Sequence, residues 1–380
     1  MNNLHIVHIN INGLRGRKTE LEVYLNETLP DVICLNETKL EAASPPNLIG
    51  YNIACNKERS SDGGRGVIIY IKNNLIHEDI SSDIEDLVAT LISLPGGKLA
   101  VIAHYCPPDK DSIDTQALNY YFKKYPNTVV TGDLNSKHTY FGCTKTDRKG
   151  DILFNLVEEN DAHVANNPDE PTRFDLKRGT AELLDYIIVS KNLSGKIMCC
   201  HTGDDIGSDH RPLHLQLSVL KSPSNHSNKR LVRPLKKCDW NCFSDALHQA
   251  DPILSDYSNP LSVDSLDIKA QAFEEIILSA FDKACPLVEV KHQGPVISSE
   301  ALALIREKRK ARRLAQRDLF YVPVYQSLEK QVKQMISKEK AVSWQTAIES
   351  LNYTDGSEFW KTFTRLTGTG KSNNRRVPKI

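Results

Sequence analysis

The stretch TVVTGDLNSKH, residues 128–138, constrains the fold most, because a β-branched run ends there in a glycine and a polar turn. The β-branched residues favour a strand. Residues two apart on a strand face the same side, so Asp133 and Asn135 point together from the strand's end. The carboxyl group can take a proton or hold a metal, whereas the amide can only donate and accept hydrogen bonds. Alone this pattern is a weak signal, since a structural strand that ends in a polar turn looks the same.

Short apolar segments alternate with turns up to about residue 220, and eight of them have the composition of strands. The predicted strands are Leu4–Ile11, Val32–Leu35, Val67–Ile71, Leu87–Leu94, Leu99–His104, Thr128–Thr131, Leu183–Val189 and Leu213–Val219. Residues 18–29 and 151–159 have helical spacing. Many strands with few helices between them favour an α+β fold, with two sheets packed face to face and helices outside.

The net charge of zero conceals two halves of opposite sign. Residues 1–220 hold 22 Lys and Arg against 30 Asp and Glu, a balance of −8, so the remaining 26 and 18 give residues 221–380 a balance of +8. An acidic half with clustered carboxylates suits a divalent metal, and a basic half suits phosphates. We therefore predict a catalytic domain over residues 1–220, a polar linker over residues 221–234, and a basic helical tail over residues 235–380.

The tail has helical periodicity in three places. One predicted helix runs from about Leu266 to Phe281, a second starts near Ser298, and a third carries Leu328 and Val332. Within the second, the run REKRKARRLAQR (306–317) has seven basic residues against one acid. A solvated helix face is the default interpretation of such a run, and contact with a nucleic-acid backbone is the alternative.

Composition excludes several classes of protein. No basic region followed by an apolar stretch opens the chain, and no apolar run is long enough to span a bilayer, so we expect no membrane partner. The nine cysteines are scattered without a CxxC pair, which disfavours a zinc site and favours free thiols in a reducing, intracellular compartment.

Six short motifs carry polar side chains where predicted strands end, which is where sheet proteins place functional groups. They are HININGLR (8–15), LNETK (35–39), HYCPP (104–108), GDLNSKH (132–138), LLDYIIVS (183–190) and SDHRP (208–212). Each has a structural alternative: Glu37 could be a solvated turn residue, Tyr105 could pack on Pro107, and Asp209 could belong to an exposed turn. Asp185 is harder to dismiss, because an acid inside an apolar strand needs a partner.

Together and in this order, the motifs resemble those of the endonuclease/exonuclease/phosphatase superfamily. The resemblance covers residues 1–220 and implies a four-layered α/β sandwich, DNase I-like, with two packed mixed β-sheets flanked by helices. The run GDLNSKHTYFG, followed by TDRKGDILFNLVEEN, is similar to the endonuclease domain of non-LTR retrotransposons, particularly jockey-type elements. KKCDWNCFSDAL in the α-helical tail resembles the segment that these elements carry before a reverse transcriptase.

The resemblance implies a metal centre. Glu37 would bind Mg²⁺, with Mn²⁺ as an alternative, helped by Asn12 and Asp209. Oxygen ligands without cysteine are the set that Mg²⁺ prefers. Repair endonucleases usually have Asp where this chain has Asn12, and an amide brings no charge, so metal binding would depend mainly on Glu37.

The resemblance also assigns catalytic and substrate-binding positions. Asp133 would orient or deprotonate the attacking water, and Tyr105 would stabilise the phosphate or the leaving group. His210 would contact the scissile phosphate, with Asp185 fixing its tautomer. Asn10, Asn135 and Thr172 are the remaining implied contacts to phosphate or substrate. Ser208 would contact phosphate or support a neighbouring site residue, while Asp209 would assist both metal and catalysis.

The function implied is a Mg²⁺-dependent DNA endonuclease that nicks one strand and leaves a 3′-hydroxyl to prime reverse transcription. Its partners would be double-stranded target DNA, element RNA through the basic tail, and a reverse transcriptase domain in a longer polyprotein, acting in the nucleus. An apurinic/apyrimidinic repair endonuclease of the same fold is the nearest alternative. A catalytically decayed nucleic-acid-binding remnant is a further one.

Overall fold

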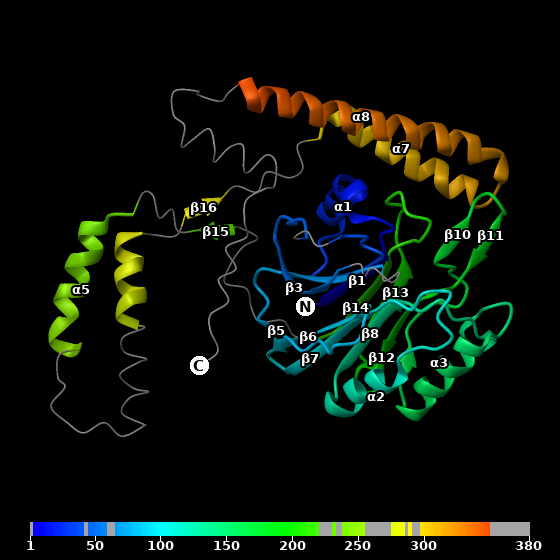
Figure 1. Cartoon of the computed structure of the whole chain (residues 1–380), viewed down its shortest axis with the longest axis horizontal. Helices are drawn as coiled ribbons and strands as arrows, with labels where there is room; N and C mark the ends of the chain where they lie inside the picture. The colour runs from blue at the N-terminus through cyan, green and yellow to red at the C-terminus, as the bar shows by residue number, and fades with distance from the viewer. Residues whose placement is uncertain are drawn as a thin grey trace. The chain divides into compact units, whose positions relative to one another are not determined.

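The computed structural model describes residues 3–41, 45–58, 65–219, 230–232, 238–254, 275–285, 288–290 and 297–349. The chain forms two compact units: residues 1–224 together with residues 294–380, and residues 225–293. The first unit contains two six-stranded sheets (Figure 1). It holds all six motifs named above.

The first sheet has the strand order β13-β14-β1-β2-β4-β3. Its strands are β1 (Leu4–Asn10), β2 (Val32–Asn36), β3 (Tyr51–Lys57), β4 (Val67–Lys72), β13 (Ile197–Thr202) and β14 (Leu213–Leu217). β1 and β2 run parallel, and the other neighbours run antiparallel. The parallel pairing places Asn10 beside Asn36, so the polar residues that end both strands meet at one edge of the sheet.

The second sheet has the strand order β5-β6-β7-β8-β12-β9. Its strands are β5 (His77–Asp79), β6 (Leu87–Leu94), β7 (Gly97–His104), β8 (Thr128–Asp133), β9 (His163–Val164) and β12 (Asp185–Val189). β7 and β8 run parallel, and β8 pairs antiparallel with β12. The register sets Asp133 directly opposite Asp185, so the end of one motif strand faces the start of another.

Three apolar clusters hold the four layers of the fold together. The inner faces of the two sheets share one cluster, which includes Ile6, Val32 and Val101. The outer face of the first sheet packs on α1 (Leu14–Thr28). The outer face of the second packs on α2 (Thr115–Lys124) and α3 (Arg148–Glu159). The predicted sandwich of two mixed sheets flanked by helices is therefore confirmed.

Smaller elements complete the first unit. They are η1 (Thr139–Phe141), α4 (Lys191–Ser194), and the two-stranded ribbon of β10 (Arg173–Asp175) and β11 (Thr180–Glu182). All eight predicted strands are present, and both predicted helices are longer at their amino ends than the periodicity indicated. The prediction missed α2 and β3. It also missed the strands β5, β9, β10, β11 and β13.

Two helices of the tail belong to the first unit. α7 (Ser299–Ala315) and α8 (Val322–Glu349), joined by η3 (Leu319–Tyr321), lie side by side (Figure 1). Ile305 of α7 and Val332 of α8 form an apolar cluster with Val23 of α1. The structure thus differs from the predicted division at residue 235, because part of the tail packs on the sandwich instead of forming a separate connector.

The basic run also differs from both of its interpretations. Lys308, Arg309 and Arg312 are buried, and each forms an ion pair with a carboxylate of the sandwich. They are therefore neither solvated nor able to contact a nucleic acid in this arrangement. Amphipathic spacing explains the difference, because these residues share the helix face that carries Ile305. Arg306, Lys310 and Arg317 remain exposed.

The second unit contains α5 (Trp240–Leu254) and the two-stranded ribbon of β15 (Arg230–Val232) and β16 (Val288–Val290). Of the helix predicted over residues 266–281, residues 275–281 are helical, and residues 266–274 lie outside the described residues. In the described part of the chain, the helices are too short or too polar to cross a membrane.

Candidate active site

The motif side chains gather where β1, β2 and β8 end and where β12 and β14 begin. Gly132, just before Asp133, is required by the neighbouring strand, since a Cβ there would lie 1.8 Å from the carbonyl oxygen of His104. Asn12, Glu37 and Asn135 each follow a strand end and have positive φ angles of 46°, 49° and 45°. Such angles are uncommon for residues other than glycine. These turns aim three polar side chains of different strands at one region.

Asn10 links the acids of two motifs. Its Nδ2 donates to Asp133 Oδ2 at 2.8 Å and to Glu37 Oε1 at 3.1 Å. Asn10 is 1% exposed. An amide donor between two carboxylates holds both in place without adding a charge. The structure therefore brings Asn10, Glu37 and Asp133 together.

Tyr105 contacts the same glutamate. Its hydroxyl donates to Glu37 Oε1 at 3.1 Å. Burial, reinforced by the charges of Glu37 and Asp133, raises the pKa of the Tyr105 phenol well above its usual range. The hydroxyl therefore keeps its proton at neutral pH and acts as a hydrogen-bond donor.

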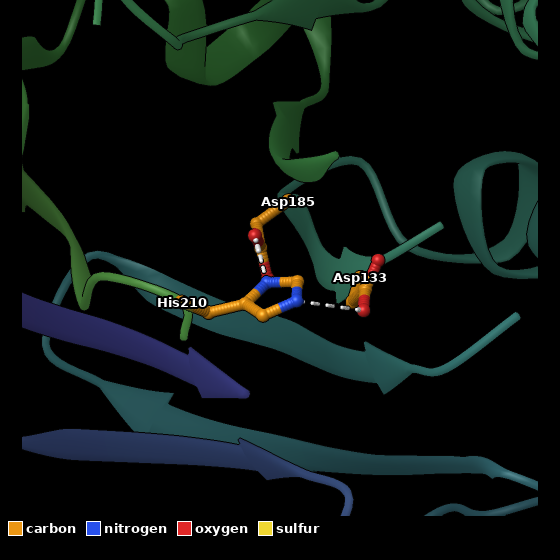
Figure 2. Close-up of side chains that lie close together, drawn as sticks. All are labelled: Asp133, Asp185 and His210. Atoms are coloured by element: carbon orange, nitrogen blue, oxygen red, sulfur yellow. Dashed lines mark hydrogen bonds and ion pairs between the residues drawn. The ribbon is translucent and has the colours of Figure 1, made fainter. Parts of the chain in front are cut away.

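His210 lies between two carboxylates (Figure 2). Its Nδ1 is 2.7 Å from Asp185 Oδ2, and its Nε2 is 3.8 Å from Asp133 Oδ2. All three residues are buried. Two flanking carboxylates favour a doubly protonated ring, in which both nitrogens donate.

The pKa shifts agree with this arrangement. Burial alone would lower the pKa of His210, but the charges of Asp185 and Asp133 raise it overall. Burial alone would raise the pKa of Asp185, but His210 and His8 lower it overall. Burial raises the pKa of Asp133 despite the opposing charge of His210. Asp185 is thus the fixed anion, and Asp133 is the carboxyl group poised to exchange a proton.

His8 was not predicted from the sequence. Its Nε2 is 2.9 Å from Asp185 Oδ1, and the residue is fully buried. The signal was present, because His8, Asn10 and Asn12 alternate on one face of a strand. Asn36 was missed as well; its Oδ1 accepts from the backbone amide of Asp133 at 3.0 Å.

Asn12 and Asp209 are in contact. Asn12 Nδ2 donates to Asp209 Oδ1 at 3.0 Å, and Arg173 Nε is 3.4 Å from Asp209 Oδ2. On its other side, Asn12 Oδ1 accepts from Lys39 Nζ, which is also 3.2 Å from Glu37 Oε2. An ammonium group therefore lies between the amide and the glutamate that were predicted to share a metal.

Asn135 lies beside Asp133. Its backbone amide donates to Asp133 Oδ1 at 3.2 Å, and its side-chain Nδ2 donates to the Cys106 carbonyl at 3.1 Å. The second bond joins the turns that follow β7 and β8, so Asn135 is held in a fixed orientation next to the acid.

Two residues with predicted substrate or supporting roles are buried. Thr172 is fully buried, and its hydroxyl accepts from the backbone amides of Leu184 and Asp185 at 3.1 and 3.0 Å. Ser208 is also fully buried, and its hydroxyl donates to the Asn10 carbonyl at 2.6 Å. Both residues hold the backbone of other site residues and present no hydroxyl to a substrate.

A second grouping could geometrically hold a metal. Asp133, Asp185 and His210 each offer one ligand atom, and these atoms lie within 4.8 Å of one another. However, both oxygens of Asp185 and the Nδ1 of His210 already share hydrogen bonds. The Glu37–Asn12 position, with its ammonium, fits a cation better.

Comparison with known proteins agrees with this architecture. Residues 99–214 match a family described as endonuclease-reverse transcriptase. The fold matches the endonuclease domain of TRAS1, a telomere-specific non-LTR retrotransposon, with a TM-score of 0.50 and 19% identity over 58% of this chain and 100% of that one. It also matches the AP endonuclease LMAP from Leishmania major, with a TM-score of 0.50 and 17% identity over 58% and 88% of the two chains.

Two Drosophila melanogaster proteins are similar in sequence. The probable RNA-directed DNA polymerase from transposon X-element is 25% identical over 81% of this chain and 34% of its own length. The RNA-directed DNA polymerase from mobile element jockey is 24% identical over 80% and 33%. This chain thus spans about a third of the length of these relatives. The first similarity extends over 323 residues and so includes part of the region after residue 220.

The two-sheet fold and its clustered motifs resemble those of the endonuclease/exonuclease/phosphatase superfamily, in agreement with the family match over residues 99–214 and with the fold of the TRAS1 endonuclease domain. In sequence, the chain is similar to part of two RNA-directed DNA polymerases of mobile elements, and in fold to the endonuclease domain of a non-LTR retrotransposon.

Proposed function

We propose that this domain is a Mg²⁺-dependent DNA endonuclease that cuts one strand and leaves a 3′-hydroxyl and a 5′-phosphate. One observation carries the proposal: Asp133 is held by Asn10 on one side and faces His210 on the other. Hydrolysis of a phosphodiester needs a base for water and a positive group for the phosphate oxygens. Asp133 and His210 can supply both.

The residues present fit a divalent ion. Glu37 Oε2 and Asn12 Oδ1 both contact the ammonium group of Lys39, so two oxygen ligands already surround a positive charge. Glu37 and Asn12 would hold the ion, with Asp209 beside them, and Mn²⁺ could replace Mg²⁺. When bound, the ion would neutralise negative charge on the phosphate.

The other residues have distinct roles in the proposed reaction. Asp133, oriented by Asn10, takes a proton from water, whose oxygen forms the new bond to phosphorus. The bond from phosphorus to the 3′ oxygen breaks, and that oxygen gains a proton to become the hydroxyl. His210 donates to a non-bridging oxygen, while Asp185 and His8 hold its ring. Tyr105 and the Asn135 amide face the same region as further hydrogen-bonding groups.

The biological role is proposed from the relatives. Jockey and X-element are named as RNA-directed DNA polymerases, which supports a polyprotein in which the nick primes reverse transcription. The substrate would be double-stranded DNA in the nucleus. Element RNA could bind Arg306, Lys310 and Arg317, which are exposed.

A plasmid-nicking experiment tests the proposal. Supercoiled plasmid should be converted to open circles with Mg²⁺ and remain supercoiled with EDTA. A DNA polymerase should extend the nick without prior treatment, because its end is a 3′-hydroxyl. Asp133→Asn is the matched inactive variant. Nicking by that variant at the wild-type rate would mean that a contaminant, or another site, performs the reaction.

A repair endonuclease remains a second candidate, because the fold matches that of the Leishmania major AP endonuclease. Two duplexes that differ only by one abasic position separate the candidates. We expect comparable cutting of both duplexes, and cutting confined to the abasic duplex would establish the repair activity instead. A decayed remnant would cut neither.

A further inference from the structure

The loop that leads to His210 is held by a helix from the tail. This loop, residues 203–210, joins β13 to β14 and carries Ser208 and Asp209. Asp205 in the loop is 5% exposed and contacts three basic residues of α7. Lys308 Nζ is 3.5 Å from Asp205 Oδ2, Arg312 NH1 is 2.9 Å from Oδ1, and Arg309 Nε donates to the Asp205 carbonyl at 3.1 Å.

The same cations reach α1. Lys308, which has no exposed surface, also pairs with Glu20, and Arg309 pairs with Glu27. Three positive side chains therefore meet three carboxylates, with the charges balanced. A buried charge is tolerated only when it is paired, so the packing of α7 and the loop conformation depend on each other.

Hydrogen bonds connect Asp205 to the site. Asp205 Oδ1 accepts from the Gly207 amide at 2.9 Å, and the Gly207 carbonyl accepts from Arg17 Nε at 2.8 Å. Gly207 has a φ of 84°, and a Cβ there would lie 3.5 Å from Lys308 Nζ. The loop backbone thus lies directly against the buried ammonium group in a conformation that favours glycine.

The next residue completes the connection. The Ser208 hydroxyl donates to the Asn10 carbonyl at 2.6 Å and accepts from the His210 amide at 3.3 Å. The path from α7 to His210 therefore runs through the Asp205 carboxylate, the backbone of Gly207 and the hydroxyl of Ser208. It is short enough that a shift in α7 would move the imidazole.

We propose that Lys308 is a positioning residue of the nuclease site, which acts through Asp205 to hold the loop that presents Asp209 and His210. This inference deepens the proposed endonuclease function and rests on it. It makes α7, which lies outside the two sheets, a part of the working enzyme. A misplacement of about 1 Å at a catalytic group can cost about 100-fold in rate.

The rival explanation is that α7 only adds stability through its apolar face. Ile305 packs in an apolar cluster with Val23 and Val332, so Ile305→Ala weakens the packing of the same helix and leaves its ion pairs in place. Lys333→Met removes an exposed lysine–glutamate pair on α8 and controls for the loss of an ion pair. Both control residues lie outside the site.

The experiment compares Lys308→Met with these controls in the full chain. The readouts are kcat and KM for nicking, hydrogen exchange of the amides of residues 203–210, and stability to urea. We expect Lys308→Met to lower kcat roughly 10- to 100-fold with little change in KM, and to speed exchange in the loop. Ile305→Ala should lower stability while kcat stays near wild type.

Additional variants keep the test decisive if Lys308→Met folds poorly. Lys308→Met combined with Glu20→Gln removes both members of one buried pair, which is tolerated better than removing one. Combining Lys308→Met with Asp205→Asn should cost little more than the larger single loss, because the residues act as a unit.

Wild-type kcat and loop exchange in the folded Lys308 variants would overturn the positioning role. A wild-type chain that nicks no DNA would refute the proposed function instead, and the exchange comparison would still test the contact between α7 and the loop.

Discussion

His8 and His210 bind opposite oxygens of the Asp185 carboxylate, at 2.9 and 2.7 Å. One aspartate therefore orients two rings, of which His210 faces Asp133. Burial alone would raise the pKa of Asp185, but His210 and His8 lower it overall, so Asp185 is an anion at neutral pH. The ring of His210 is thus fixed in position and charge before any substrate arrives.

The Asp185–His210 pair should act as a unit. Asp185→Ala and His210→Ala should each lower kcat by roughly 10³-fold or more, and the double variant should be little worse than either. Single-turnover nicking of a labelled duplex measures these losses. Losses that multiply in the double variant would show that the two residues act independently.

Glu37 should be essential for metal-dependent activity and dispensable for folding. Glu37→Gln keeps the size of the side chain and the acceptor for Tyr105, but it removes the only carboxylate of its motif. We expect nicking at millimolar Mg²⁺ to fall by roughly 100-fold or more, with stability to urea within about 1 kcal/mol of wild type. Unchanged activity across a Mg²⁺ titration would exclude Glu37 from the metal site.

Lys39 should compete with the metal. Its ammonium group contacts Glu37 Oε2 and Asn12 Oδ1, so a divalent ion there must displace it or tolerate its repulsion. Lys39→Met should therefore bind Mn²⁺ or Mg²⁺ several-fold more tightly in a calorimetric titration without DNA. Lys18→Met, which removes a lysine–glutamate pair elsewhere on the surface, is the control. Weaker binding in Lys39→Met would contradict competition.

His214 should make the sandwich sensitive to acid. Burial, helped by the nearby His5 and His201, lowers the pKa of His214 to about 3. The unfolded chain takes up this proton near pH 6.5, so stability falls as pH decreases from about 6.5 towards 3, by about 1.4 kcal/mol per pH unit in the middle of that window. His214→Asn should flatten that dependence in urea unfolding at several pH values. An unchanged slope would assign the acid sensitivity to other groups.

The fold was predictable because its signals are local. Each of the eight predicted strands is a short apolar run bounded by turn residues, and runs such as Val32–Leu35 pack inside the sandwich. α2 was missed because its buried stripe of Ala117, Leu118 and Tyr121 is short and lies among polar residues. The packing of α7 depends on ion pairs between residues almost 300 positions apart, which no local pattern encodes.

The site was predictable to the extent that strand ends bring motifs together. Glu37 follows the end of β2, Asp133 ends β8 and His210 precedes the start of β14, and these three positions converge. The sequence could not distinguish a side chain that faces solvent from one that supports a neighbour, so Thr172 was assigned to substrate and both roles stayed open for Ser208. Burial separates the two cases.

Asn12, Glu37 and Asn135 have left-handed backbone conformations. Residues that favour activity at these positions therefore lower the stability of the fold. A non-glycine residue in this conformation costs roughly 1 kcal/mol or more, and glutamate is less tolerant of it than asparagine or glycine. A screen for heat resistance alone should therefore enrich Glu37→Gly or Glu37→Asn and silence the nuclease. Thermostable variants of this domain must be sought with a nicking assay in the same screen.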